Sequence, residues 1–268
     1  MKTSYLDRGG ARIAYDVQGA GPLVLCLPGM GELRSSYRFT VPALVEAGYR
    51  VATMDLRGHG DSDDGFDRYD DVALGADAGA LIAHLGGPAV IVGNSMGAGG
   101  AVLAAVEQPA DVVGLALIGP FVRDPEVNPL TALLLRLLLL RPWGPAAWLA
   151  YHRKLFTGRP PADLTEHQAR IRASLRRADH WRSFVQTTRT SHAPAWARID
   201  DVRVPTLVVM GEQDPDFPDA VAEARYTAER LRAELLLVPE AGHYPMVEYP
   251  EPVNTALISF LDRVFGRA

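Results

Sequence analysis

The chain has 268 residues, of which 48% are hydrophobic and 22% charged, and its formal net charge is −5 at pH 7. This composition is ordinary for a globular protein with a sizeable core, and the length suits one large α/β domain that carries an insertion. The acidic balance weighs against a nucleic-acid-binding protein, which usually shows a strongly basic face.

The sequence carries no signal for export, membrane insertion or disulfide formation. Residues 1–16 lack the apolar segment of a signal peptide. The most apolar stretch, 130–140, is shorter than the roughly 20 residues that span a bilayer and contains Arg136. Cys26 is the only cysteine, and its apolar neighbours predict that it is buried. We therefore expect a cytoplasmic protein without a membrane span, whose partner is a small-molecule substrate.

Strand and helix patterns alternate through the first part of the chain. Two short alternating segments flank Gly9 and Gly10 and predict a β-hairpin. Continuous apolar runs, typical of strands buried on both faces, then alternate with helical segments. Strands are predicted at 23–29, 49–58, 89–94 and 112–119, and helices at 35–48, 70–85 and 96–108.

The pattern changes between Phe121 and Trp196, where only helices are indicated. Alternation then resumes, with strands near 204–210 and 233–239 and helices near 219–231 and 252–265. The fold class is therefore α/β, with a doubly wound, mostly parallel sheet of about eight strands. The core is predicted to comprise 1–120 and 197–268, and 121–196 to form an inserted helical cap of a size that suits a lid.

Ser95 lies in the sequence Gly93-Asn94-Ser95-Met96-Gly97, which fits the pattern G-x-S-x-G. In this pattern a serine occupies a sharp turn between a strand and a helix, and small residues two positions away relieve the crowding. N–H groups at the start of the following helix favour developing negative charge. Ser95 is therefore a candidate nucleophile. In the alternative interpretation, the glycines only shape a turn.

A serine nucleophile needs a base, and the base needs an acid that orients it. Glu212, Asp214 and Asp216 follow the apolar strand TLVVM, and His243 follows the next strand on a glycine-flanked loop. Both loops lie at the carboxyl ends of strands, where ligand sites form in open α/β sheets.

The chain resembles the α/β-hydrolase superfamily in five stretches that occur in the expected order: LCLPGMG, DLRGHGDSD, GNSMG, GEQDPDFP and AGHYPMVEYPE. The resemblance implies a catalytic triad in which Ser95 is the nucleophile, Asp214 the acid and His243 the base. Asp216 is the main competitor for the role of the acid. Asp124 lies several residues beyond an alternative acid position of the superfamily.

The resemblance also implies an oxyanion hole formed by the backbone N–H groups of Met30 and Met96. Many relatives have His-Gly in the first of these loops, where this chain has Pro28-Gly29. Because backbone groups supply the hydrogen bonds, the function can persist while the hydrogen bonding of the loop differs.

Other polar residues are interpreted as structural. In the stretch 55–62, glycines with positive φ and polar side chains predict a turn, rather than catalysis by His59 or Asp61. The histidines of the insertion are interpreted as structural or surface residues: His152, His167, His180 and His192. No cluster has metal-ligand spacing and no phosphate-binding loop is present, so we expect neither a metal nor a cofactor.

Some residues of the insertion could contact or attract the substrate. Its leucine run at 130–140 predicts a helix packed between cap and core, or alternatively leucines that line an acyl-binding cavity or its entrance. Arginines between 170 and 182 predict a solvated helix face, or alternatively an attraction for an anionic substrate. Phe121, Trp181 and Tyr244 are candidate walls of the substrate pocket.

The sequence thus predicts a serine hydrolase that cleaves a carboxylic ester of a small to medium, mostly apolar substrate through an acyl-enzyme on Ser95. Serine at this position weighs against dehalogenases and epoxide hydrolases of this fold, which use an aspartate. Hydrolysis of a C–C bond in a diketone, of a lactone or of a thioester, and perhydrolysis, use the same triad and are alternatives. A non-catalytic small-molecule-binding protein is an alternative of another class.

Overall fold

A single mixed sheet forms the centre of the computed structural model, which describes residues 2–124 and 128–267. Its strands are β1 (Ser4–Asp7), β2 (Arg12–Gln18), β3 (Leu23–Leu27), β4 (Arg50–Met54), β5 (Ala89–Asn94), β6 (Val112–Ile118), β7 (Thr206–Gly211) and β8 (Glu234–Val238). They lie in the order β1-β2-β4-β3-β5-β6-β7-β8. Among the described strands, β2 pairs antiparallel with β1 and with β4, and all other pairings are parallel. The predicted hairpin and the mostly parallel sheet of eight strands are confirmed.

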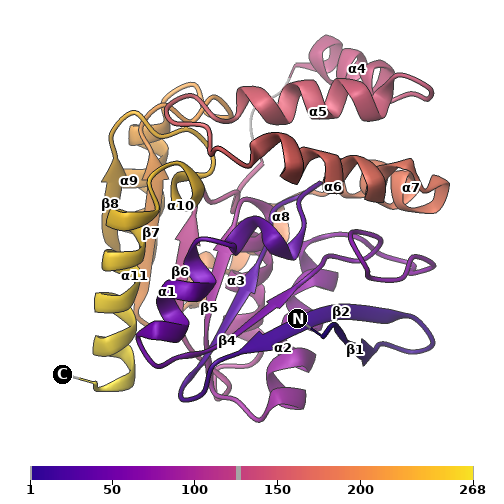
Figure 1. The fold of residues 1–268 in the computed structure, drawn as a ribbon. Coiled ribbons are helices and arrows are strands. Elements are labelled where there is room, and N and C mark those ends of the chain that lie inside the picture. Colours follow the sequence, from indigo (N-terminus) through magenta and orange to yellow (C-terminus); the bar gives the residue numbers. More distant parts are fainter. Residues whose placement is uncertain (1, 125–127, 268) are drawn as a thin grey trace.

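The central strands are apolar throughout because helices cover both faces of the sheet (Figure 1). Every residue of β3 and of β5 is buried, and Cys26 is fully buried as predicted. Along β3, Leu25 and Leu27 pack into the apolar core of one face, and Val24 and Cys26 into that of the other. Because β3 to β8 pair parallel, the carboxyl ends of these strands lie at one edge of the sheet.

The core helices occupy positions close to those predicted. They are η1 (Arg34–Tyr37), α1 (Thr40–Glu46), α2 (Asp71–Leu85), α3 (Met96–Glu107), α9 (Ala220–Leu231), α10 (Pro245–Glu248) and α11 (Pro250–Phe265). Asp70 and Asp219 cap α2 and α9, because each side chain accepts a hydrogen bond from a backbone N–H of the first turn. Side chains of α2, α3 and α9 pack on one face of the sheet, and those of α1 and α11 on the other.

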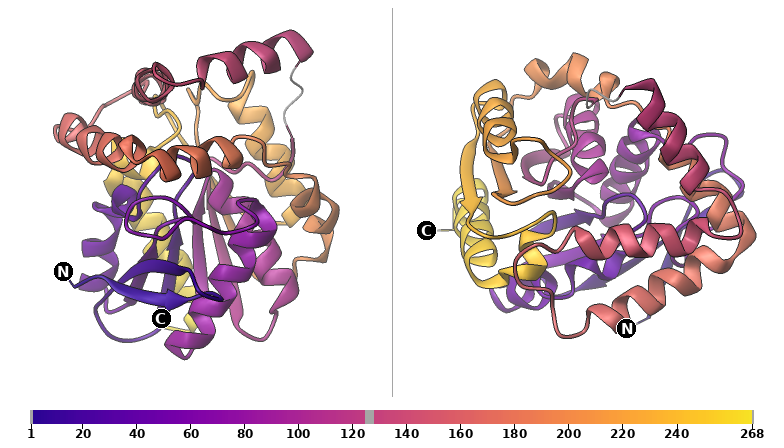
Figure 2. Two further views of the ribbon diagram at one scale, coloured as in Figure 1. Left: turned by 90° about the vertical axis from the view of Figure 1, so that its right-hand side faces the viewer. Right: turned by 90° about the horizontal axis from the view of Figure 1, so that it is seen from above.

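The segment between β6 and β7 is helical, as predicted. It contains α4 (Pro129–Leu138), α5 (Gly144–Lys154), α6 (Leu164–Arg176), α7 (Ala178–Thr187), α8 (Ala193–Arg198) and η2 (Ile199–Asp201). Helices α4 to α7 lie across one end of the sheet, and Figure 2 shows them from above. Helix α8 packs on α2 and α3 of the core. Residues 125–127 of the predicted cap lie outside the described residues, and its boundaries stay a prediction.

The leucine run does not pack between cap and core, so that prediction is wrong. Its described leucines other than Leu139 are exposed, from 48% at Leu137 to 65% at Leu130. The reason is the position of α4 at the outer edge of the cap (Figure 1, Figure 2), away from the sheet. Within the described part of the chain, no helix is long and apolar enough to cross a membrane.

The arginines between 170 and 182 lie on exposed surface, as the solvated-face interpretation predicts. They are Arg170, Arg172, Arg176, Arg177 and Arg182. Of these, Arg182 pairs with Asp179 one turn earlier on the same helix. These cations therefore face solvent.

Candidate active site

Ser95 stands at a strained turn between β5 and α3. Its backbone has φ 57° and ψ −123°, a conformation that side-chain-bearing residues rarely adopt. Ser95 is partly exposed, whereas the residues on either side are buried. A Cβ atom at Gly93 would lie 2.4 Å from the Gly97 carbonyl oxygen, and one at Gly97 would lie 2.4 Å from that of Leu27. Both glycines are therefore required sterically, as the sequence pattern predicts.

We expect Gly97→Ala to destabilise the protein by about 1–3 kcal/mol, the range for overpacking a tight site. The added methyl group would meet the backbone of β3, which cannot rotate away as a side chain can. Gly114→Ala is the matched control, because its Cβ would meet only valine methyl groups at 3.2–3.4 Å. Urea unfolding monitored by circular dichroism measures both. Equal losses of unfolding free energy would contradict this account.

Asp214 and His243 follow β7 and β8 and form a buried pair. The distance from Asp214 Oδ2 to His243 Nδ1 is 2.7 Å, and the two residues are 3% and 2% exposed. Because a carboxylate only accepts, the imidazole donates its Nδ1–H. The loop after β7 and the loop after β8 are joined by a hydrogen bond of 2.9 Å from the Gln213 N–H to the Ala241 carbonyl. The pair is thus held by backbone as well as side-chain contacts.

The turn at Ser95 lies against the loop of His243. The Asn94 side-chain amide donates to the Ile118 carbonyl at 3.0 Å and to the His243 carbonyl at 3.4 Å. The Phe121 N–H donates to the Ser95 carbonyl at 3.3 Å, and the Phe121 ring meets the His243 ring edge-on at 5.9 Å. The structure therefore brings Ser95, Asp214 and His243 together at one edge of the sheet.

Asp216 is the second carboxylate beside the imidazole. Its Oδ2 lies 3.7 Å from His243 Nδ1, a longer distance than that of Asp214. Its side chain accepts a hydrogen bond from the Tyr151 hydroxyl of α5, and its N–H donates to Asp214 Oδ1 at 3.0 Å. Asp214 is therefore the direct partner of His243.

The two carboxylates determine the protonation of His243. Burial alone lowers the pKa of the imidazole, but the negative charges of Asp214 and Asp216 outweigh burial and raise the pKa to about 9.

The loop after β3 touches the turn at Ser95. A Cβ atom at Gly29 would lie 2.8 Å from Ser95 Cβ, so the backbone of this loop approaches the serine closely. Among the residues that the structure describes, the N–H groups of Met30 and Met96 make no backbone hydrogen bond in the turns and loops. The oxyanion-hole role of these two N–H groups stays a prediction.

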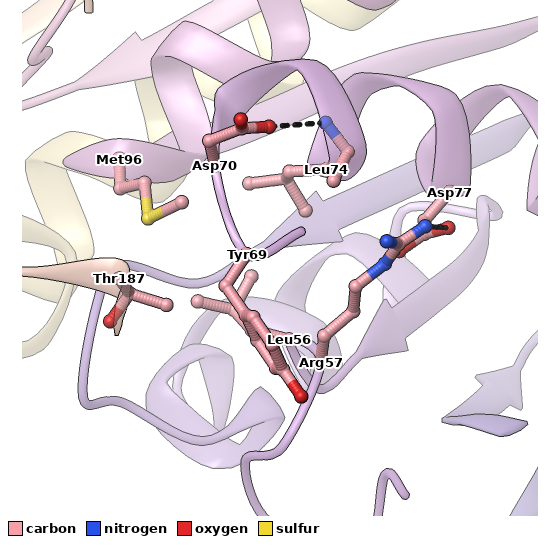
Figure 3. Close-up of a pocket in the computed structure, with 9 residues that line it drawn as sticks. Leu56, Arg57, Tyr69, Asp70, Leu74, Asp77, Met96 and Thr187 are labelled. Atoms are coloured by element: carbon pink, nitrogen blue, oxygen red, sulfur yellow. Dashed lines mark hydrogen bonds and ion pairs between the residues drawn. The ribbon is translucent and has the colours of Figure 1, made fainter. Parts of the chain in front are cut away.

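The side chain of Met96 borders a small cavity between core and cap (Figure 3). Leu56 and Tyr69 of the core and Thr187 of α7 also line it. Its volume of about 10 Å³ is room for about one water molecule. This cavity is therefore too small to hold an ester substrate.

Two of the three predicted pocket walls lie beside His243. The Phe121 ring also contacts Phe217, at 4.7 Å between centroids. The Tyr244 ring lies 5.1 Å from that of His243 and is buried. Trp181 lies instead in the apolar cluster of the cap, where its ring is 5.0 Å from that of Phe184. The structure does not bring Trp181 together with His243.

The stretch 55–62 forms the predicted turn. Gly58 and Gly60 have φ of 65° and 53°, and Asp61 pairs with Arg34. His59 connects this turn to the loop after β3, because its Nε2 accepts a hydrogen bond from the Gly31 N–H at 3.2 Å. Sequence reasoning did not find this link to the loop after β3.

The histidines of the insertion are buried or paired, so a surface role is wrong for them. His152 and His167 donate to the buried carboxylate of Glu32 at 2.6 and 2.8 Å. His180 contacts Ser174, and His192 pairs with Asp71 at 2.7 Å. Asp124 bonds Ser191 and the His192 N–H on the surface rather than His243.

The fold also assembles two groups of potential metal ligands that sequence spacing did not indicate. One is Glu32 with His152 and His167, and the other is Asp214 and Asp216 with His243. In the second group, His243 Nδ1 already donates to Asp214.

Comparisons with known proteins bear on the family and on the fold. The sequence profile described as the alpha/beta hydrolase family matches residues 24–256. The chain is 32% identical to 2-hydroxy-6-oxononadienedioate/2-hydroxy-6-oxononatrienedioate hydrolase 2 of Pseudomonas putida, over 97% of this chain and 92% of that protein.

Two solved structures share the fold over nearly their whole length. One is a thermophilic esterase from Thermogutta terrifontis, with a TM-score of 0.80 and 23% identity over 98% of this chain and 99% of that chain. The other is a putative aryl esterase from Burkholderia cenocepacia, with a TM-score of 0.84 and 21% identity over 99% of this chain and 100% of that chain.

Proposed function

The chain belongs to the alpha/beta hydrolase family and is a hydrolase, and we propose that it cleaves a carboxylic ester through an acyl-enzyme on Ser95. The observation that carries the proposal is the 2.7 Å hydrogen bond between His243 Nδ1 and Asp214 Oδ2, at the sheet edge where Ser95 has its strained backbone. Because the chain is a hydrolase, the alternative of a non-catalytic small-molecule-binding protein is excluded.

The proposed reaction follows from which groups hold protons. Because the Nδ1–H of His243 is directed at Asp214, the Nε2 of the neutral imidazole is the atom that takes the proton of the Ser95 hydroxyl. The Ser95 oxygen then attacks the ester carbonyl, and the N–H groups of Met30 and Met96 stabilise the oxyanion.

The second half of the reaction releases the products. His243 gives its proton to the leaving alcohol, and the acyl group remains on Ser95. A water molecule then attacks the acyl-enzyme while His243 again accepts a proton, which releases the acid and restores the serine. Asp214 orients the imidazole throughout.

The surroundings of His243 support an apolar substrate. The rings of Phe121 and Tyr244 lie next to that of His243, and the Phe217 ring contacts that of Phe121. The described arginines between 170 and 182 are exposed to solvent instead. A small to medium, uncharged ester fits this distribution better than a dianion does.

Hydrolysis of a C–C bond is the second candidate. The P. putida relative is named for a hydroxy-keto diacid rather than an ester, and a serine triad serves both reactions. A turnover panel separates the candidates: p-nitrophenyl esters of graded chain length, a lactone, a thioester and a 2-hydroxy-6-oxo-dienoic acid. We expect the highest kcat/KM for short or medium esters. A higher value for the keto acid would overturn the ester proposal.

The pH dependence of ester hydrolysis is a direct consequence of the raised pKa of His243. Only the neutral imidazole accepts the serine proton, so kcat/KM is expected to rise about tenfold per pH unit below pH 9 and to level off above it. In Asp216→Asn one negative charge is lost, so the imidazolium is less stabilised and the midpoint is expected to fall by about one unit.

Asp200→Asn is the control for this shift, because Asp200 is exposed and pairs with Arg230. Its kcat/KM profile should superimpose on that of the wild type. A wild-type midpoint below pH 7, or an unchanged midpoint in Asp216→Asn, would show that the two carboxylates do not control the base.

A further inference from the structure

The loop that carries the Met30 N–H is a tight turn. The Glu32 N–H donates to the Gly29 carbonyl at 3.2 Å, and Gly31 has φ +73°. A turn closed in this way with a positive φ at its third residue is of type II, which requires glycine there. The orientation of the Met30 N–H therefore depends on what holds Gly31 and Glu32.

His59 holds the middle of the turn. Its Nδ1 donates to the Arg57 carbonyl at 2.9 Å, so its Nε2 has no proton and accepts from the Gly31 N–H. Burial lowers the pKa of His59 to about 4, so this acceptor persists at neutral pH. On another side, a Cβ at Gly31 would lie 2.4 Å from the Trp148 ring, which places α5 directly against the turn.

Glu32 connects the end of the turn to the cap. Its carboxylate is 1% exposed, and it accepts from His152 Nε2 of α5 and from His167 Nε2 of α6. It also accepts from the Leu33 N–H at 3.1 Å. Burial alone would raise the pKa of Glu32, but the two histidines outweigh it and keep the pKa below its usual range. If either histidine were lost while the cap stayed in place, an acceptor of this buried carboxylate would remain unpaired, which is costly.

The protons in this cluster favour hydrogen bonding over metal binding. The Gln168 amide nitrogen lies 3.0 Å from the Leu149 carbonyl and 3.1 Å from His152 Nδ1. The carbonyl fixes the amide as a donor, so His152 Nδ1 accepts and its Nε2 carries the proton given to Glu32. A metal ion on Nε2 would require a proton on Nδ1, directed at the amide N–H.

We propose that Glu32, His152 and His167 form a polar clasp by which helices α5 and α6 position the Met30 N–H for oxyanion binding. Glu32 is then a positioning residue that acts through the turn, and the oxyanion hole is complete only when the cap is in place. The inference rests on the proposed function of Ser95 and Met30, and goes beyond it by giving the cap a part in transition-state stabilisation.

Glu32→Gln tests the clasp, because the amide has one acceptor oxygen where the carboxylate has two. We expect kcat for the preferred ester to fall about 10- to 100-fold, less than or comparable to loss of a whole oxyanion donor, while KM changes less than about threefold. The inhibition constant of a trifluoromethyl ketone, which forms a tetrahedral oxyanion on the serine, should rise by the same factor as kcat/KM falls.

Asp163→Asn is the matched control. Asp163 also joins the cap to the core, through two hydrogen bonds from Arg38 at 2.6 and 2.7 Å, but it does not touch the turn. Its kcat and the inhibition constant should stay within about threefold of the wild type. Equal effects in both variants would mean that any loosening of the cap suffices, and would overturn the specific role of Glu32.

A second pair of variants keeps the test informative if Glu32→Gln does not fold. His167→Gln retains an N–H donor and should keep most of the oxyanion affinity, whereas His167→Leu removes the donor and should lose it. Equal inhibition constants for the two would contradict the clasp. One equivalent of a divalent metal in the purified protein, lost together with activity on chelation, would also overturn it.

Labelling of the wild type by a fluorophosphonate distinguishes failure of the proposed function from failure of the clasp. If Ser95 of the wild type is not labelled, the proposed function fails. If Ser95 is labelled and Glu32→Gln has wild-type kcat and inhibitor affinity, only the clasp fails.

Discussion

Ser95→Ala is expected to lower kcat for ester hydrolysis by about 10⁵- to 10⁶-fold, the loss that follows removal of the nucleophile in a serine triad. Alanine lacks the hydroxyl that forms the acyl-enzyme, and His243 then has no proton to accept. The fold should survive, because alanine is smaller than serine and the elbow glycines are unchanged. Steady-state kinetics and thermal unfolding measure the two effects separately.

Ser4→Ala provides the comparison for this variant. Ser4 begins the edge strand β1, which three strands (β2, β4 and β3) separate from β5 and the turn of Ser95. The kcat of Ser4→Ala should therefore equal that of the wild type. Retention of more than about one thousandth of the activity in Ser95→Ala would place the nucleophile elsewhere.

Asp214→Asn is expected to lower kcat by about 10⁴-fold. The amide can donate a hydrogen to His243 Nδ1, which favours the tautomer whose Nε2 carries a proton and cannot accept one from Ser95. Because Asp214 Oδ2 lies 2.7 Å from His243 Nδ1, Asp214 is the carboxylate whose replacement changes the tautomer of His243. The assay is kcat at a pH on the plateau of each variant, so that a shifted pKa does not mimic a lost tautomer.

Asp216→Asn is the matched variant, because Asp216 lies 3.7 Å from the same nitrogen. On its own pH plateau, it should retain activity within about tenfold of the wild type. If Asp216→Asn lost about 10⁴-fold in kcat and Asp214→Asn stayed within about tenfold of the wild type, Asp216 would be the acid of the triad.

The sheet and the elbow could be predicted because their signals are local. Continuous apolar runs such as that of β5 arise where both faces are covered, and two glycines two positions from Ser95 are needed wherever a serine takes this backbone conformation. That an acid of the loop after β7 lies near His243 follows from local position, since the loops of both residues follow neighbouring parallel strands. The choice of Asp214 among the acids of that loop comes instead from the resemblance to the α/β-hydrolase superfamily.

The cap could be predicted only as helical. Leucine content shows that a helix is apolar but not which element covers it, and the described leucines of α4 are exposed. The contact of Glu32 with His152 and His167 joins residues 120 and 135 positions apart. No spacing rule links such residues. A buried Glu directly after a glycine turn and two histidines on successive cap helices acquire meaning only once the cap lies on the core.

The most direct test of the account is the site of covalent modification in the wild-type protein. After reaction with a fluorophosphonate, proteolysis and mass spectrometry locate the added phosphonyl group. The account predicts one equivalent on the peptide that contains Ser95, formed faster as the pH rises toward 9 because neutral His243 activates the serine. Labelling at another residue, or none at Ser95 under conditions where the ester is hydrolysed, would contradict it.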